Sequence, residues 1–182
     1  MASGAGSRFG GNKLFADVEG RPLVDRAMDA YPPALFHRAL VVSRYPALLV
    51  LAAARGYHSI LNQGADEGIS ASIRLGLAEM GGADGIMFAV CDQPWLTEDS
   101  VKRVITSFEA QPDRIAALAW QGKKGNPCLF PPSLYGELAA LTGDRGGGAV
   151  IKAHPESLLL VEAAHPRELH DIDRPDDLTV GR

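Results

Sequence analysis

The sequence has few cysteines, no excess of positive charge and no long apolar run, and each shortage excludes a class of protein. Its two cysteines, Cys91 and Cys128, lie far apart and form no C-x-x-C pair, which excludes a disulfide-rich scaffold and favours a reducing, cytoplasmic environment. Eighteen Lys and Arg residues face 22 Asp and Glu, a formal net charge of −4, so no basic footprint for nucleic acid is present. No apolar run reaches transmembrane length and the glycine-rich start is unlike a signal peptide, so we expect no membrane contact.

The remaining composition is that of a soluble globular domain, with 46% hydrophobic and 22% charged residues. Apolar segments alternate between strand-like and helix-like patterns. The expected strands cover 39–43, 58–61, 85–90, 115–120, 128–130, 157–161 and 168–172, and the expected helices cover 22–30, 46–56, 131–141 and 146–154, with two more beginning near 68 and 97. This alternation predicts one α/β domain over residues 1–182, a three-layer α/β/α sandwich with a mostly parallel, Rossmann-like sheet.

A glycine-rich run opens the chain and carries two cations, Arg8 and Lys13. Glycines let backbone N–H groups approach an anion closely, so the run is suited to a polyphosphate. It matches neither the Walker loop, because Asn12 and Leu14 flank Lys13, nor the G-x-G-x-x-G fingerprint, because Phe9 stands at the third glycine position. A flexible glycine-rich terminus with incidental cations is the alternative.

Asp92 ends the most continuous apolar segment, in the run Val90-Cys91-Asp92-Gln93-Pro94. Ligands of open α/β sheets sit at the carboxyl ends of strands, so this carboxylate is expected to hold a metal–phosphate complex. The alternative is that Asp92 caps the helix beginning near Thr97.

A second acidic group lies near the end of the chain. Asp171 and Asp173 alternate along an expected strand and so share a face, and either of them completes a Mg²⁺ site with Asp92. The structural alternative assigns Asp173 or Asp176 to the cap of a helix beginning at Pro175.

Two further segments are candidates for ligand contact. Asn126 presents an amide after a turn that holds Lys123 and Lys124, although lysines on a turn are more often solvated. The run Gly143-Asp144-Arg145-Gly146 precedes a helix whose N-terminus favours an anion, or it is a plain loop. Histidines lack zinc-ligand spacing, and Ser70 and Ser72 have no His–Asp pattern of a hydrolase triad.

Six motifs in this order resemble the nucleotidyltransferases that attach a nucleotide to molybdopterin, and most of all their cytidylyltransferase branch. They are A-S-G-x-G-S-R-F-G-x-N-K-L at 2–14, G-I-S-A-S-I-R at 68–74, C-D-Q-P at 91–94, G-N-P-C-L-F at 125–130, G-D-R-G at 143–146 and D-I-D-R-P-D-D-L at 171–178. The resemblance covers almost the whole chain and implies a fold of the nucleotide-diphospho-sugar transferase type.

The resemblance also implies a role for each matching residue. Catalysis falls to Arg8, Lys13 and Asp92; nucleotide binding to Ala2, Ser3, Gly4, Gly6, Ser7, Gly10, Gln63, Ser70 and Asn126; and Mg²⁺ to Asp92 with Asp171 or Asp173. The implied reaction transfers CMP from CTP to the terminal phosphate of molybdopterin, and a molybdenum hydroxylase is the implied partner for the product. Guanylyl transfer from GTP, transfer to a sugar or terpenoid phosphate, and non-catalytic cofactor binding remain alternatives.

One departure from the family concerns the first strand. Family members carry a hydrophobic strand before the glycine loop, whereas this sequence begins inside the loop. We expect either a start codon placed too late, or a gapped sheet with a disordered loop, because neighbouring strands would lose their hydrogen-bond partners.

Overall fold

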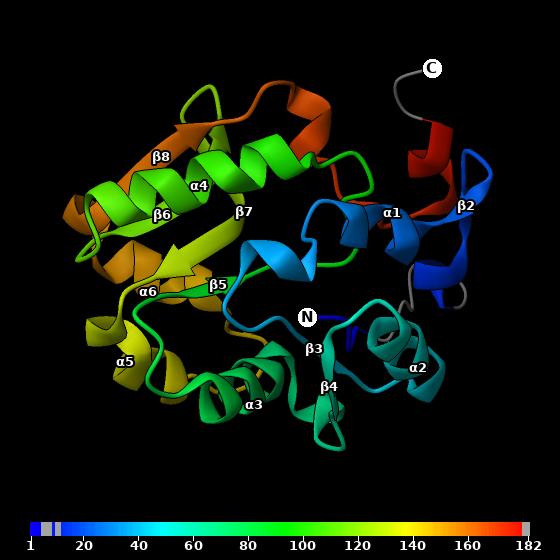
Figure 1. Cartoon of the computed structure of the whole chain (residues 1–182), viewed down its shortest axis with the longest axis horizontal. Helices are drawn as coiled ribbons and strands as arrows, with labels where there is room; N and C mark the ends of the chain where they lie inside the picture. The colour runs from blue at the N-terminus through cyan, green and yellow to red at the C-terminus, as the bar shows by residue number, and fades with distance from the viewer. Residues whose placement is uncertain (5–8, 10–11, 180–182) are drawn as a thin grey trace.

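The computed structural model describes residues 1–4, 9 and 12–179 and has two halves, each with its own β-structure (Figure 1). The strands are β1 (Asp17–Val18), β2 (Arg21–Pro22), β3 (Leu40–Ser43), β4 (His58–Leu61), β5 (Ile86–Phe88), β6 (Ile115–Trp120), β7 (Lys123–Phe130) and β8 (Leu158–Glu162). The α-helices are α1 (Leu23–Asp29), α2 (Pro46–Ala54), α3 (Ile69–Met80), α4 (Glu98–Ala110), α5 (Tyr135–Ala139) and α6 (Gly147–Ala153).

The larger sheet has the strand order β5-β7-β6-β8 and is mixed. β6 and β8 are parallel, whereas β7 runs antiparallel to both of its neighbours. β7 reverses direction because Gln121 and Gly122, both with positive φ, form a tight turn directly after β6. The α/β class is therefore confirmed, with parallel pairs in both halves and one reversed strand in the larger sheet.

Alternation along β6 explains the three layers. Ile115 and Ala117 face a core shared with α3, α5 and α6, whereas Ala116 and Leu118 face a core shared with α4. Figure 1 shows α4 on one side of the sheet and α3, α5 and α6 on the other. The expected α/β/α sandwich is confirmed in this half.

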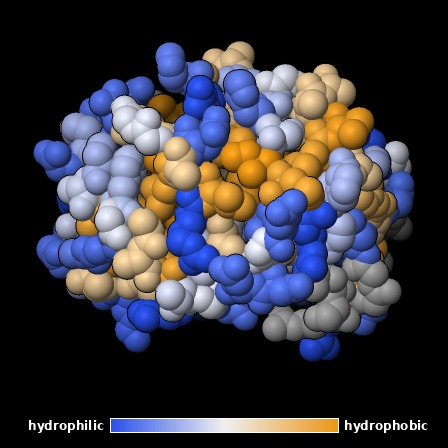
Figure 2. All heavy atoms as spheres, turned by 90° about the horizontal axis from the view of Figure 1, so that it is seen from below, coloured by the Kyte–Doolittle hydropathy of each residue, from blue (hydrophilic) through white to orange (hydrophobic). Residues whose placement is uncertain are grey.

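The smaller half pairs β3 with β4 in parallel. Its core gathers around Leu23, Leu48 and Val41 and includes Ile172 from the end of the chain. Hydrophobic residues also gather on the surface over α2 and β4 (Figure 2), where Val50 is 71% exposed. None of the helices in the described part of the chain is long and apolar enough to cross a membrane.

The expected strand over 168–172 is wrong. A 3₁₀ helix, Pro166–Leu169, begins there instead, because Pro166 lacks the N–H of a strand residue and the His165 ring accepts from the Arg167 amide. Ile172 still reaches the segment after β5, since its N–H donates to the Asp92 carbonyl at 2.9 Å. This hydrogen bond and the burial of the Ile172 side chain bring the acidic C-terminal segment to the site.

The gap expected beside the first residues is present. Ala2 forms a parallel bridge to Ser43 of β3, and the Met1 amino group donates to the Ala89 carbonyl beyond β5 at 2.6 Å. Over the rest of their length the β3–β4 pair and the larger sheet are separate. The expectation of a disordered glycine loop concerns residues 5–8 and 10–11, which lie outside the described residues.

Candidate functional site

A cavity of about 380 Å³ lies where the first residues, the β4–α3 connection and the segment after β5 meet. Ser3 and Gly4, which the sequence assigned to nucleotide binding, and Asp92, which it assigned to a metal, line this cavity. A cavity of this size is within the range of small-molecule sites.

Lys13 stands at the centre of the charged part of the site. Its Nζ donates to Asp92 Oδ2 at 2.8 Å and to Asp173 Oδ1 at 2.9 Å, and its side chain is 15% exposed. Burial disfavours the ammonium, but the hydrogen bonds and charges of the two carboxylates outweigh burial and raise the pKa of Lys13. The structure thus brings Lys13 together with Asp92, 79 positions along the sequence, and with Asp173, 160 positions along it.

Neighbouring residues make two of the cap contacts that the sequence left open. Thr97, not Asp92, caps α4, because its hydroxyl accepts from the Ser100 amide. Asp177 orients the start of the final turn by accepting from the amides of Asp173 and Arg174. The alternative reading of Asp92 as a cap is therefore wrong, since a cap needs an oxygen two or three residues before the N–H that it receives.

Asp171 lies on the other side of Ile172 from Asp173 and contacts a different partner. Its Oδ1 accepts from Gln93 Nε2 at 2.9 Å. Loss of water around this carboxyl and the charge of Asp92 raise its pKa, against the hydrogen bond from Gln93, which lowers it. Because the expected strand is absent, the two aspartates share a region of the site without sharing a strand face.

This raised pKa gives a stability prediction for Asp171→Asn. Asparagine keeps an acceptor for Gln93 and removes repulsion from Asp92, so we expect Tm at pH 7 to rise by about 1–2 °C. A folded pKa above the unfolded value of 3.8 means that ionisation costs stability, so the gain should vanish as pH falls below that value. Thermal unfolding of both proteins between pH 3 and 8, in the presence of a chelator, measures this gain in Tm. A lower Tm of the variant at pH 7 would contradict the claim that Asp92 repels Asp171.

The first residues are held against β3 and β4. Ala2 is 4% exposed, and Ser3 Oγ accepts from Asn62 Nδ2 at 3.3 Å. The Tyr45 hydroxyl donates to the Gly4 carbonyl at 2.9 Å. These contacts fix the entrance to the glycine-rich run at the cavity.

Four predicted nucleotide-binding residues within the described part of the chain are not among those that line the cavity, and one of them is the buried Ala2. Gln63 is exposed after β4, Asn126 lies on β7, and Ser70 is fully buried at the start of α3, where its hydroxyl accepts from Arg74. Their nucleotide contact stays a prediction. Gly6, Ser7, Arg8 and Gly10 lie outside the described residues.

Sequence reasoning missed two buried amides at the site, Asn62 and Gln93, each 2% exposed. Each donates to a neighbour, while Asn62 Oδ1 and Gln93 Oε1 are buried with no hydrogen-bond partner among the described residues. Asn62 directly follows β4, so the rule that ligands sit at the carboxyl ends of strands, which singled out Asp92, could also have singled out Asn62. We infer from burial that Asn62, not its exposed neighbour Gln63, is the inward residue.

Gly68 closes the cavity beside the second glycine-rich run. Its φ is +95°, and a Cβ there would stand 2.4 Å from the Gly143 carbonyl carbon. Only glycine permits this approach of two backbones. The turn lets Asp144 line the cavity beside Gly68.

Known proteins resemble this chain along most of its length. The family model described as MobA-like NTP transferase domain matches residues 1–158. The purine catabolism protein PucB of Bacillus subtilis is 26% identical over 194 residues, covering 100% of this chain and 93% of that protein. The nicotine blue oxidoreductase of Paenarthrobacter nicotinovorans is 26% identical over 189 residues, covering 98% and 92%.

Solved structures share the fold. Rv0371c of Mycobacterium tuberculosis has a TM-score of 0.80 at 24% identity, covering 97% of this chain and 92% of that one. Its complex with manganese has a TM-score of 0.73 at 23% identity, covering 96% and 91%. Molybdopterin-guanine dinucleotide biosynthesis protein A of Archaeoglobus fulgidus has a TM-score of 0.68 at 16% identity, covering 97% and 92%. With a family model that spans most of its residues and a fold shared along its length, this chain belongs to the MobA-like NTP transferase domain family.

Proposed function

We propose that this protein transfers CMP from CTP to the terminal phosphate of a molybdopterin-type acceptor and releases pyrophosphate. The observation that carries the proposal is the position of Lys13, held between Asp92 and Asp173 at the end of the glycine-rich run. A cation and two carboxylates beside a small-molecule cavity suit a triphosphate that arrives with a divalent cation. Membership of the NTP transferase family supports this use of the site.

The donor set fits Mg²⁺ as the cofactor. Asp92 Oδ1 is buried without a hydrogen-bond partner among the described residues, and carboxylate oxygens are the ligands that hard divalent cations prefer. No three acidic, histidine or cysteine side chains form a ready cluster in the part of the chain that the structure describes. We therefore assign the cation to Asp92 and one acid of the 171–173 segment together with phosphate oxygens; when bound, it neutralises charge on those oxygens.

The chain's own residues position the two substrates and neutralise the charge of the phosphates. Lys13 reaches the phosphates by exchanging a carboxylate partner for a phosphate oxygen, and Arg8 adds a second cation. The acceptor phosphate attacks the α-phosphorus in line, the bond to the β-phosphate oxygen breaks, and pyrophosphate leaves. The nucleophile is already an anion, so no base is needed, and catalysis rests on orientation and charge.

The choice of CTP over GTP rests on the A-S-G start and the G-D-R-G-G-G run, which resemble the cytidylyl enzymes. Asp144 of that run lines the cavity, which supports its contact with the nucleotide. The structural neighbour named for molybdopterin-guanine dinucleotide makes GTP the comparison that matters most.

The test is calorimetric titration with CTP and Mg²⁺, with GTP in parallel, followed by pyrophosphate release on adding a molybdopterin-type acceptor. Mg²⁺-dependent CTP binding and turnover support the proposal. Tighter GTP binding overturns the choice of base, and CTP binding without pyrophosphate release overturns transfer in favour of a cofactor-binding role. A sugar phosphate that replaces the pterin acceptor at equal rate overturns the acceptor class.

A further inference from the structure

The 3₁₀ helix Pro166–Leu169, which precedes the acidic 171–173 segment, is fixed to the larger half through a buried carboxylate. Glu168 is 3% exposed, and its carboxylate accepts from the Thr97 hydroxyl at 3.1 Å and from the Ser100 hydroxyl. Thr97 caps α4 and Ser100 lies in its first turn. A buried carboxylate is held firmly by such bonds, because breaking them would leave its charge without a partner. Arg167 therefore projects from a firmly held part of the larger half.

Arg167 contacts two other segments of the chain at once. Its Cζ lies 4.0 Å from the centroid of the Trp95 ring, and its Nη2 donates to Glu19 Oε1 at 3.2 Å. Because a guanidinium is planar, stacking on a ring and a hydrogen bond at its edge together fix its orientation. The His170 ring, at the end of the same 3₁₀ helix, lies 5.7 Å from the Trp95 ring between centroids. We call Arg167, Trp95 and Glu19 the clamp.

Glu19 stands at the tip of the hairpin formed by β1 and β2, where its φ of +53° and the φ of +85° at Gly20 make the turn. Arg26 of α1 holds this hairpin, because its Nε donates to the Val18 carbonyl at 2.7 Å and its Nη2 lies 3.0 Å from Glu19 Oε2. Partial loss of water around Glu19 opposes ionisation, but the charge of Arg26 and the hydrogen bond from Arg167 outweigh it and lower the pKa of Glu19. The carboxylate therefore stays charged at neutral pH and joins both arginines.

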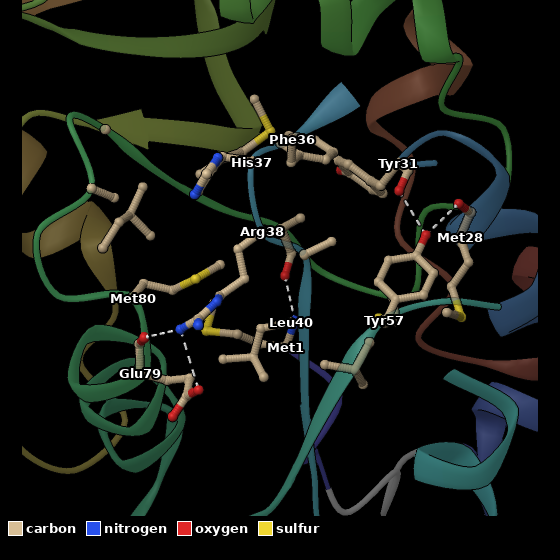
Figure 3. A pocket seen from close by; sticks show the side chains of 18 of the residues that line it. Met1, Met28, Tyr31, Phe36, His37, Arg38, Leu40, Tyr57, Glu79 and Met80 are labelled. Atoms are coloured by element: carbon tan, nitrogen blue, oxygen red, sulfur yellow. Dashed lines mark hydrogen bonds and ion pairs between the residues drawn. The ribbon is translucent and has the colours of Figure 1, made fainter. Parts of the chain in front are cut away.

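α1 is itself fixed within the smaller half at its other end. Figure 3 shows the Tyr57 hydroxyl within hydrogen-bond distance of the carbonyls of Met28, at 3.1 Å, and Tyr31, at 2.6 Å, beside a second cavity of about 430 Å³. Tyr57 directly precedes β4. The clamp therefore joins a hairpin mounted on the smaller half to a 3₁₀ helix mounted on the larger half.

Each clamp residue is close in sequence to one charged residue of the site. The pairs are Glu19 and Lys13, Trp95 and Asp92, and Arg167 and Asp173. The clamp residues themselves lie outside the lining of the cavity of about 380 Å³. The same three segments are thus in contact twice, once inside the site through the Lys13 ammonium and once outside it through the Arg167 guanidinium.

The contact inside the site changes during the proposed reaction, whereas the clamp does not. When Lys13 exchanges a carboxylate for a phosphate oxygen, its hold on Asp92 or Asp173 is lost. We infer that Arg167 is a positioning residue for Lys13: the clamp keeps the segment of Lys13 in place beside the two aspartates while the ammonium changes partners. This inference rests on the proposed function, because the exchange is needed only if phosphates enter the site.

Two simpler roles of Arg167 predict different results. A residue that acts through its charge alone can be replaced by lysine, which has neither the planar face nor the fork of a guanidinium. A residue that only stabilises the fold lowers Tm without changing the rate of the folded protein. A positioning residue requires the guanidinium, and its effect on the rate disappears when Lys13 is absent.

The experiment compares Arg167→Ala and Arg167→Lys with the control Arg114→Ala. Arg114 also anchors its surroundings, by donating to the carbonyls of Glu156 and Leu158, but it precedes β6 at the end of the sheet opposite to Asp92. We expect both Arg167 variants to lower kcat of nucleotidyl transfer about tenfold and to keep KM for CTP within about twofold, because a displaced ammonium loses its alignment with the reacting phosphates. Full activity of Arg167→Lys, or an equal loss in Arg114→Ala, would overturn the inference.

A double-mutant cycle tests whether Arg167 acts through Lys13. In the Lys13→Met background, Arg167→Ala should lower the rate by no more than about twofold, because the side chain that Arg167 positions is already gone. The same loss in both backgrounds would show that Arg167 acts independently of Lys13, and the inference would be wrong.

A readout without nucleotide separates failure of this inference from failure of the proposed function. The Ala16 amide donates to the Lys13 carbonyl at 3.0 Å, so its hydrogen exchange reports local opening of the segment of Lys13. Well below Tm, Arg167→Ala should speed exchange at Ala16 about fivefold and leave the amides of β6 unchanged. Unchanged exchange at Ala16, or an equal rise in Arg114→Ala, overturns the inference. If no variant transfers a nucleotide, the proposed reaction fails and exchange alone decides whether the clamp holds this segment.

Discussion

Asp92→Asn is expected to lower the rate of nucleotidyl transfer by about 10³-fold, which is the upper end of the loss for one preorganised electrostatic contact. Asparagine is nearly isosteric, but it removes the charge that holds Lys13 and that we assign to the cation. Pyrophosphate release at saturating CTP measures the loss. Raising Mg²⁺ tenfold should recover only part of the rate, since the missing charge is fixed in the protein.

Asp113→Asn is the matched control for this variant. Asp113 is exposed just before β6, and β6 runs in the same direction as β5, so Asp113 lies at the opposite end of the sheet from Asp92. Its substitution also removes one negative charge and should leave the rate of nucleotidyl transfer within twofold of that of the unsubstituted protein. Equal rates in the Asp92 and Asp113 variants would remove Asp92 from the mechanism.

Lys13→Met has the second large expected effect, a fall in transfer of about 10²–10³-fold. Methionine keeps the aliphatic volume and removes the ammonium that would contact the phosphates. It also leaves Asp92 and Asp173 facing each other without their shared cation, so Tm at pH 7 should fall. The measurements are steady-state kinetics and thermal unfolding on the same preparation.

The control for Lys13 is Lys152→Met, an exposed lysine in the last turn of α6. It should keep both rate and Tm. A Lys13→Met protein with unchanged kcat but raised KM would limit Lys13 to binding, and one with unchanged kinetics would contradict the assignment.

The sequence was most informative where one acidic residue follows a buried strand. Asp92 could be singled out because it follows a continuous apolar run, although the strand in that run, β5, already ends at Phe88. Its contact with Lys13 was not predictable, since it depends on how the segment after Ile172 returns to the core. A single buried side chain and one backbone hydrogen bond decide that return, and neither leaves a periodic pattern.

The errors have a common physical cause. The 168–172 segment contains alternating apolar residues, but the prolines and local side-chain acceptors that set its backbone compete with the strand pattern. Asn62 was missed because it and Gln63 both follow the same strand, and only packing shows which one points inward. The pairing of β7 with β5 was likewise not predictable from the pattern, because the tight turn after β6 fixes only the antiparallel β6–β7 pair.

The ion pairs of Lys13 have a thermodynamic consequence for how metal and nucleotide arrive. Without nucleotide, Asp92 and Asp173 are neutralised by an internal cation, so a bare divalent ion must compete with an ammonium already in hydrogen-bond contact. A triphosphate that draws Lys13 away frees those oxygens for the ion. By reciprocity, an ion bound to the same oxygens must favour the triphosphate by an equal factor. The two ligands are therefore expected to bind with positive heterotropic cooperativity. Without nucleotide, the protein is expected to bind a divalent ion only weakly.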